Sequence, residues 1–420
     1  MKKVPLLLLC VSIISFWGCK KHHSDVIPSA PVSNPITKDT LSGFIKGTML
    51  AGKTYYVSGD IYVKPADTLT VLPGVTVVVI GNPNLSPPKT PAIHISGTFL
   101  CNGTKDEQIT FKPSDLNPQW PNGYWGGIHC DSAAKVVTMT WTNVSYTGGP
   151  DVSGGSQFAF SVVGVAPSST NGNFTSNTKV IVENCSFLSG IDDCIRLSGP
   201  ITVSIKGNII RHQGSDDGDN INIKRGVTGD VCYNYIWSAA NNSIKLETSN
   251  VVLLPKTTVN VYNNTIISGG WRKLGETTSG ILVDLFASAS VYNNLIVNTQ
   301  RGVRITSVSD TTTIKGHYGN NLFYTTVDST RKYFYPPTDW GKPRSSDILS
   351  TGINNNNPML VSFDVNYTAM DDHNNAHLSA GSPAIGKGNT NAPSYSNLGT
   401  LMAPGKDIGC YQMDGSGNQR

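Results

Sequence analysis

The chain has 420 residues and carries 32 Lys and Arg against 28 Asp and Glu, and only 14% of its residues are charged. This balance argues against a nucleic-acid-binding protein, which usually shows a strongly basic surface. With 42 Gly, 24 Pro and 38% apolar residues, the composition indicates a turn-rich globular chain and excludes a disordered protein or a bundle of long helices.

The N-terminus has the pattern of an export signal. Two lysines precede an apolar run from Val4 to Trp17, which is shorter than a membrane-spanning helix. Gly18-Cys19 resembles a bacterial lipobox. This resemblance implies that residues 1–18 are removed and that Cys19 becomes a lipidated N-terminus; an ordinary secretory signal that is cut nearby is the alternative.

The segment 19–42 reads as a flexible tether, because three Pro lie among Ser, Val, Asn and Thr. The lipobox implies a protein of the bacterial cell envelope that is anchored to the outer membrane, on its periplasmic or its cell-surface side. We expect the folded part, residues 43–412, to be a monomer and residues 413–420 to be a tail.

Short segments that alternate polar and apolar residues follow the tether, and this pattern is typical of strands with one buried face. In the N-terminal third we predict strands over Thr54 to Val63, Thr68 to Ile80, Ala92 to Leu100, Gln108 to Phe111 and Trp125 to Cys130. The six cysteines beyond residue 19 form no Cys-x-x-Cys pair, so a zinc or redox motif is unsupported and their disulfide pairing stays open. They are Cys101, Cys130, Cys185, Cys194, Cys232 and Cys410.

Two families of short segments recur in the middle of the chain and alternate with each other. The first family aligns an Asn in each copy, at Asn208, Asn234, Asn264 and Asn294, with Asn321 in a looser copy. The second family begins at Asp193, Asp219, Asn242, Ser279 and Arg301. Such repeats, with no helical stretch between them, can bury their apolar columns only by coiling into a parallel β-solenoid. The aligned Asn side chains are then expected to hydrogen-bond from rung to rung.

These features resemble the single-stranded right-handed parallel β-helix of the pectate-lyase class, also called pectin-lyase-like. The sequence motifs Leu69-Thr-Val-Leu-Pro-Gly74 and Trp125-Gly-Gly-Ile128 are similar to those in the opening coils of β-helix lipoproteins of Bacteroidetes. The segment His377 to Ile385 is similar to the segment that closes such helices. The resemblance implies an all-β protein. The resemblance says little about activity, because the same fold occurs in lyases, hydrolases, esterases and adhesins.

The alternate positions of the second family must point outward. One outward column reads Arg196, Asn222, Lys245, Leu282 and Arg304, and its neighbour reads Ser198, Lys224, Glu247, Asp284 and Thr306. Lyases of acidic glycans need a base to remove the proton beside a uronate and a cation to neutralise its carboxylate. By similarity in kind to chondroitinase B and alginate lyases, we expect Lys245 as the base, Arg304 as the neutralising cation and Arg196 in the catalytic group, with Lys224 binding substrate. A solvated row of surface ion pairs is the alternative.

Calcium is the expected cofactor if one is present, because carboxylate oxygens are its preferred ligands. Glu247 and Asp284 form one candidate pair of ligands, and Asp216 and Asp217 form another in the acidic stretch after His212.

Asp192-Asp193-Cys194 resembles the Asp-Asp-Cys of polygalacturonases, in which paired carboxylates activate water. The chain lacks that family's upstream Asn-Thr-Asp-Gly and its His-Gly segment, and turn capping by Asp193 and Asp219 is a simpler account. A glycoside hydrolase is therefore a further alternative to the lyase.

The interval between Asn242 and Ser279 is longer than its neighbours and contains Gly269 to Thr278. Loop insertions on a solenoid usually form walls of a binding groove, so Trp271 and Arg272 are candidates for binding a sugar ring and its acidic group. The expected partner is an acidic polysaccharide, and a non-catalytic glycan-binding protein or an adhesin or scaffold are the alternatives to an enzyme.

Overall fold

The computed structural model describes residues 33–82, 89–114, 123–150, 157–165, 178–214, 217–252, 255–353, 355–366, 373–395, 398–400 and 402–420. The signal segment, Cys19 and the tether up to residue 32 lie outside the described residues, as does Asp216. Within the described part no helix is long and apolar enough to cross a membrane.

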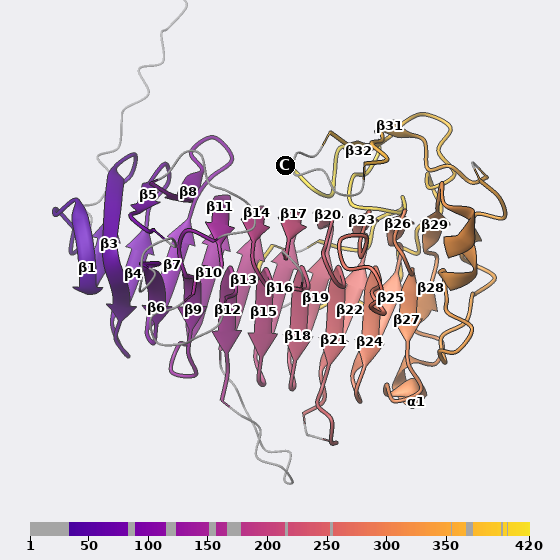
Figure 1. Ribbon diagram of the computed structural model, residues 1–420, viewed down its shortest axis with the longest axis horizontal. Helices are drawn as coiled ribbons and strands as arrows, with labels where there is room; N and C mark the ends of the chain where they lie inside the picture. The colour runs from indigo at the N-terminus through magenta and orange to yellow at the C-terminus, as the bar shows by residue number, and fades with distance from the viewer. Residues whose placement is uncertain are drawn as a thin grey trace, which may run out of the picture. The chain divides into compact units, whose positions relative to one another are not determined.

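Residues Asn34–Arg420 are built from three ladders of parallel strands that the chain visits in turn, one strand of each ladder per coil (Figure 1). The first ladder contains β2 Gly47–Met49, β4 Thr68–Val71, β7 Thr98–Asn102, β10 Val136–Thr140, β13 Lys179–Glu183, β16 Thr202–Lys206, β19 Thr228–Cys232, β22 Thr258–Tyr262, β25 Ser288–Tyr292 and β28 Tyr318–Gly319.

The second ladder contains β1 Thr40–Phe44, β3 Thr54–Val63, β5 Thr76–Val79, β8 Ile109–Pro113, β11 Thr142–Thr147, β14 Ser186–Gly190, β17 Ile209–Gln213, β20 Tyr235–Trp237, β23 Thr265–Ile267, β26 Leu295–Val297, β29 Leu322–Tyr324 and β30 Ile348–Leu349. The third ladder contains β6 Ala92–Ile95, β9 Gly127–Cys130, β12 Phe160–Val163, β15 Ile195–Ser198, β18 Ile221–Lys224, β21 Ile244–Glu247, β24 Ile281–Asp284 and β27 Val303–Ile305. The long strand β3 joins these two ladders, because its first half pairs with β5 and its second half with β6. The fold is therefore a parallel β-helix, as the sequence predicts.

Helical structure is confined to the four-residue α1 Thr311–Ile314 and the 3-10 helix η1 Asp328–Tyr333, within the part of the chain that the structure describes. The only antiparallel pair of named strands in that part is β31 Leu360–Ser362 with β32 Asn375–Leu378.

Two of the strands predicted in the N-terminal third are each split by a turn. The segment predicted over Thr68 to Ile80 forms β4 and β5, because Pro73 and Gly74 break it and Gly74 has a φ of +73°. The segment predicted over Ala92 to Leu100 forms β6 and β7, with the break at Ser96 and Gly97. At Gly97 a Cβ atom would lie 2.2 Å from the Asp67 carbonyl oxygen, so only glycine fits this corner.

The interior is filled by columns of apolar side chains, as the alternation predicts. Ile195, Ile221, Ile244, Ile281 and Val303 are in register on the third ladder, and all are 0% exposed. Strand β1 begins at Thr40 and belongs to the β-helix, because Leu41 is buried and pairs with Val57 of β3. The folded part therefore begins before residue 43 and includes residues that the sequence analysis assigns to the tether.

The predicted Asn column is confirmed. Each side-chain amide donates to the Oδ1 atom of the Asn one coil further on, at 2.9 to 3.0 Å from Asn208 through Asn234, Asn264 and Asn294 to Asn321. The same Oδ1 atoms also accept the backbone N–H of the preceding Asn, at 3.0 to 3.1 Å. The amides thereby satisfy backbone groups that are buried in the turn between the first and second ladders.

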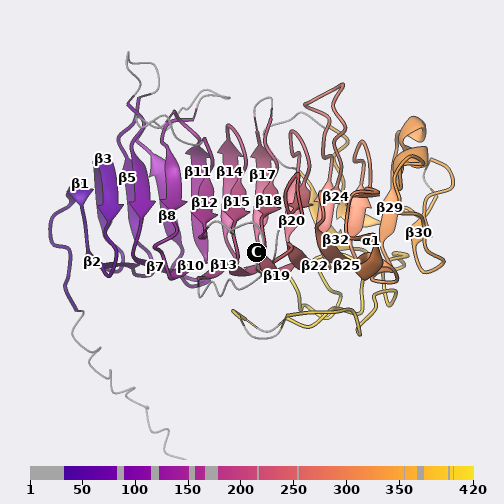
Figure 2. The same ribbon diagram turned by 90° about the horizontal axis from the view of Figure 1, so that it is seen from below.

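The C-terminal segment runs back along the outside of the coils (Figures 1 and 2). It covers a second apolar cluster that includes Trp237, Ile267 and Tyr324 on the outer face of the second ladder, with Ile408 and Cys410 on the returning segment. The last residues, which the sequence treats as a tail, also contact the coils: Asn418 donates to the Tyr233 carbonyl oxygen at 2.9 Å, and Arg420 donates to Asn143 Oδ1 at 2.9 Å. The outer face of the third ladder carries the predicted charged columns.

Candidate functional site

The outer face of the third ladder carries the two polar columns in the register that the sequence predicts. Arg196, Asn222 and Lys245 are Cα partners on β15, β18 and β21, and Lys224 and Glu247 are partners on the last two of these strands. Successive strands of a sheet lie about 4.8 Å apart, so side chains in one column are in reach of each other.

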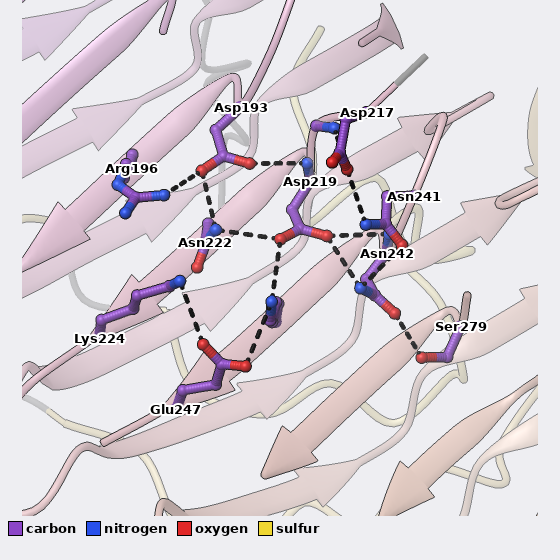
Figure 3. Close-up of polar contacts among 12 residues, drawn as sticks. Asp193, Arg196, Asp217, Asp219, Asn222, Lys224, Asn241, Asn242, Glu247 and Ser279 are labelled. Carbon is purple, nitrogen blue, oxygen red and sulfur yellow. Dashed lines mark hydrogen bonds and ion pairs between the residues drawn. The ribbon is translucent and has the colours of Figure 1, made fainter. Parts of the chain in front are cut away.

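Asp219 lies at the centre of a hydrogen-bonded network that links three coils (Figure 3). Its Oδ1 accepts the backbone N–H and the side-chain amide of Asn242, at 3.0 and 2.9 Å. Its Oδ2 accepts the side-chain amide of Asn222 at 3.0 Å, and the same amide nitrogen also donates to Asp193 Oδ2 at 2.8 Å. Asp193 Oδ1 in turn accepts the backbone N–H of Asp219 at 2.8 Å. The turn-capping role that the sequence suggests for Asp193 and Asp219 is thus present.

Cations cover these carboxylates on the solvent side. Arg196 donates to Asp193 Oδ2 at 2.8 Å, and Lys245 Nζ lies 3.8 Å from Asp219 Oδ2 and 3.2 Å from Glu247 Oε1. Lys224 Nζ lies 3.1 Å from the other oxygen of Glu247. The side chains of Lys224 and Lys245 are 22% and 20% exposed, whereas that of Asp219 is 4% exposed, so the cations face solvent and the central carboxyl lies beneath them.

The surroundings of Lys245 favour its charged form. Burial by itself lowers the pKa of Lys245, but the charges of Asp219 and Glu247 raise it by more than burial lowers it. The net pKa therefore lies above the ordinary value for lysine. A lysine with a raised pKa is protonated at neutral pH. Lys245 is therefore suited to binding an anion or donating a proton, and poorly suited to the role of a base.

A second group of carboxylates lies beside Asp193 and Asp219, at the start of the same coils. The backbone of Gly218 packs against that of Asp192, and a Cβ atom at Gly218 would lie 2.5 Å from the Asp192 carbonyl carbon. Gly218 has a φ of +112°, so glycine is needed here both for the turn and for the close approach. This contact brings Asp217 next to Asp192.

The environments of Asp192 and Asp217 move their pKa values in opposite directions. Burial, followed by the charge of Asp193, raises the pKa of Asp192 to about 6. Partial burial of Asp217 opposes ionisation, but hydrogen bonds from Lys273, Gly218 and Asn241 lower its pKa below the ordinary value. Lys273 Nζ lies 3.0 Å from Asp217 Oδ2. Around pH 5, Asp192 therefore keeps its proton while Asp217 is ionised.

Asp219 also has a raised pKa. Burial is the main cause and the charge of Asp193 adds to it; Lys245 and Asn242 act in the opposite direction, and the result is a pKa of about 7. Asp219 is covered by its neighbours, so its carboxyl is poorly placed to contact a bound molecule. Its charge instead influences the protonation of the side chains around it, such as Lys245.

Arg304 and Asp284 lie on the same face but bond to other partners. Leu282 occupies the rung between Lys245 and Arg304. Arg304 donates to Asp339 Oδ2 at 2.8 Å and to the Thr277 carbonyl oxygen at 3.1 Å. Asp284 accepts a hydrogen bond from the Thr306 hydroxyl at 2.5 Å, and its Oδ1 also accepts the backbone N–H of Leu285. Arg304 is therefore held at the edge of the network around Asp219.

The inserted loop between β23 and β24 carries the two candidates Trp271 and Arg272, followed by Lys273, and the three residues have different contacts. Arg272 donates to the Ser238 carbonyl oxygen at 2.6 Å and to the carbonyl oxygens of Gln213 and Gly214, so its guanidinium fastens the loop to the turns beneath. Lys273 pairs with Asp217. Trp271 donates its indole N–H to the Asn298 carbonyl oxygen at 2.5 Å and lines a hollow of about 310 Å³ together with Arg301, Lys332 and Tyr333.

No group of three or more His, Cys, Asp or Glu that could hold a metal ion occurs among the described residues. Both oxygens of Glu247 face lysine ammonium groups, a setting that disfavours a cation between Glu247 and Asp284. Asp216, the expected partner of Asp217 in a calcium loop, lies outside the described residues.

Sequence reasoning missed the central place of Asp219 and the bridging amide of Asn222. The sequence did contain a signal for this network, because Asp193, Asp219 and Asn242 occupy the same position before successive strands. Side chains at the same position on neighbouring coils lie close together. It also missed Lys332 and the place of Arg301 beside the inserted loop, because η1 reaches this loop only through the tertiary fold.

No protein-family model, curated protein or solved structure matched the chain. The parallel β-helix is therefore established by the strand pairing of the chain itself.

Proposed function

We propose that the protein is a cell-envelope enzyme that cleaves an acidic polysaccharide by acid–base catalysis on the outer face of the third ladder. The observation that carries this proposal is the opposed pair of neighbouring carboxyl groups, Asp192 with its pKa raised to about 6 and Asp217 with its pKa lowered. Groups whose environments push their pKa values apart are typical of catalytic acids and bases.

The pair is suited to hydrolysis of a glycosidic bond. Asp192 donates its proton to the glycosidic oxygen, while the Asp217 carboxylate accepts a proton from the water that attacks the anomeric carbon. The bond between the anomeric carbon and the glycosidic oxygen breaks, a bond to the water oxygen forms, and the products are an alcohol and a new reducing end. The hydrolase alternative from the sequence thus gains support from the site.

The cations next to this pair favour an acidic substrate. Arg196 and Lys245 are partly exposed, with the coil of Asn222 between them, and a guanidinium or ammonium group binds a uronate carboxylate by charge-assisted hydrogen bonds. In this scheme Lys245 and Arg196 bind substrate and Lys224 holds Glu247 in place. Elimination with Lys245 as the base, which the sequence suggests, would require this lysine to lose a proton that Asp219 and Glu247 stabilise.

Incubation with polygalacturonate, alginate and glycosaminoglycans tests the proposal. We expect new reducing ends without absorbance from unsaturated uronate, and we expect Asp192→Asn and Asp217→Asn each to lower kcat/KM by about 10² to 10⁴ fold, the usual contribution of a general acid or base. Asp106→Asn, an exposed carboxyl on the loop between β7 and β8, is the matched control. Unsaturated products would instead support a lyase, and binding without cleavage would support a non-catalytic glycan-binding protein.

We also propose that Cys19 is lipidated and anchors the protein to the outer membrane, on the basis of the N-terminal sequence alone. Globomycin, which inhibits the lipoprotein signal peptidase, should make a precursor accumulate that keeps residues 1–18, and Cys19→Ala should lower the amount of protein in the outer membrane. Normal processing in globomycin together with unchanged outer-membrane retention of Cys19→Ala would contradict the anchor.

A further inference from the structure

The hollow beside the inserted loop differs from the network around Asp219 in its charge balance. Within the described part of the chain, Arg196, Lys224, Lys245 and Arg304 each lie within 4.0 Å of a carboxylate. In the hollow, Arg301 and Lys332 have no carboxylate at that distance among the described residues. The network is therefore largely neutralised by its own carboxylates, whereas the hollow presents two cations whose charge is unmatched.

Arg301 keeps most of its hydrogen-bonding capacity. Its guanidinium donates to the Glu276 carbonyl oxygen at 3.3 Å, and its Cζ atom lies 5.3 Å from the centroid of the Tyr333 ring. Within the described residues this is the one protein acceptor that it contacts, so most of its five N–H donors are available to a ligand. Burial and the neighbouring charge of Arg304 lower the pKa of Arg301, a cost that a bound anion would relieve.

Lys332 and the two aromatic rings complete the lining. Lys332 Nζ lies 5.0 Å from the Tyr333 ring centroid, so the Tyr333 ring holds both cations at the same hollow. The Trp271 indole is fixed by its bond to the Asn298 carbonyl oxygen. The volume of about 310 Å³ is at the low end of the range for small-ligand sites, which suits a sugar unit rather than a large ligand.

The hollow is also aligned with Asp219, which lies on the same coil as Asp217 of the catalytic pair. Arg301 precedes β27 at the position that Asp219 occupies before β18, and Asn242 and Ser279 hold the same position on the two coils between them. Three rungs at roughly 4.8 Å each separate Asp219 from Arg301 along the axis, about 14 Å, which a short oligosaccharide can span. The inserted loop connects both places, because Lys273 pairs with Asp217 and Trp271 lines the hollow.

We propose that the hollow formed by Trp271, Arg301, Lys332 and Tyr333 is a subsite for one uronate residue of the polysaccharide, with its carboxylate bound by Arg301 and Lys332 and its ring against Trp271. This inference rests on the proposed function only in taking an acidic polysaccharide as the ligand. It adds a second place for the recognition of negative charge, apart from Arg196 and Lys245, and leaves bond cleavage to Asp192 and Asp217.

Isothermal titration calorimetry with hexamers of galacturonate and of mannuronate tests the subsite, using Asp192→Asn as the background so that the ligand is not consumed. We expect Arg301→Gln and Lys332→Met each to weaken binding about tenfold or more, the effect of losing a charge-assisted hydrogen bond. Trp271→Ala should also weaken it. Carboxyl-reduced hexamers, which keep the sugar ring but lack the charge, should bind at least tenfold more weakly than the uronates.

Lys105→Met is the matched control, since Lys105 is an exposed cation between β7 and β8 and its loss removes the same charge from a distant coil; we expect its binding to be unchanged. Circular dichroism melting establishes that each variant is folded. The subsite is overturned if Arg301→Gln and Lys332→Met bind the uronate hexamers as tightly as the background protein, or if the carboxyl-reduced hexamers bind equally well. If Lys224→Met or Lys245→Met weakens binding while the hollow variants do not, the subsite is overturned but the proposed function stands. Failure of the background protein to bind any uronate hexamer overturns both.

Discussion

The buried carboxyl of Asp219 makes stability depend on pH in a direction that can be worked out. Its pKa rises from 3.8 in the unfolded chain to about 7 in the folded protein. A carboxyl with a raised folded pKa favours the fold fully below pH 3.8, and this advantage is lost as the pH rises through about 7. At 1.36 kcal/mol per pKa unit, the ionised side chain costs about 4 kcal/mol at pH 8.

Asp219→Asn removes this titration while keeping the shape of the side chain. The side-chain oxygen of the variant can still accept both hydrogen bonds from Asn242, although an amide nitrogen replaces the oxygen that faces Asn222 and Lys245. We therefore expect a constant loss of stability from these two contacts and, superimposed on it, a loss of pH dependence. An unfolding entropy of about 2 cal/mol/K per residue over residues 34–420 converts 4 kcal/mol into about 5 °C.

The assay is thermal unfolding followed by circular dichroism at pH values between 5 and 8.5. The Tm of the original protein should fall relative to that of Asp219→Asn by about 3 °C across this range, because more than a third of the cost of ionising Asp219 is already present at pH 5. Lys245→Met should extend the fall to higher pH and deepen it, because Lys245 lowers the pKa of Asp219 and its loss leaves the ionised carboxyl without that partner; the added cost then appears as a larger drop in Tm by pH 8.5. Asp106→Asn should keep the original profile. Parallel Tm profiles for the original protein and Asp219→Asn would refute the reasoning.

Three further predictions concern the Asn column, the cysteines and the catalytic pair. Asn264→Ala removes the amide that accepts the buried backbone N–H of Asn234 and should lower the free energy of unfolding by about 2 to 4 kcal/mol in a denaturant titration, whereas the exposed Asn391→Ala should have almost no effect. The six cysteines of the folded part are all free and buried, so a thiol reagent should label them only after unfolding, and rapid labelling of the native protein would contradict this packing. The kcat/KM of the proposed enzyme should fall as the pH rises above about 6, because Asp192 loses its proton there; a profile that is flat from pH 5 to 8 would argue against Asp192 as the acid.

The β-helix could be predicted from the sequence because its signals are local and repeated. The alternation of apolar and polar residues in each short strand decides which side chains are buried, and the aligned Asn residues mark one turn of each coil. The sequence therefore predicted the inward columns, the Asn column and the register of Arg196, Lys224, Lys245 and Glu247.

The tertiary structure decided which of the outward side chains interact. A column gives the order of residues along the axis but not the partner that each long side chain reaches, so Lys245 bonds to Asp219 and Glu247 while Arg304 turns to Asp339. The hollow at Trp271 and the covering of the second ladder by the C-terminal segment depend on residues that are far apart in the chain, such as Trp271 with Tyr333 and Tyr233 with Asn418. No periodic pattern records these contacts, because each occurs once, where a non-repeating segment meets the coils.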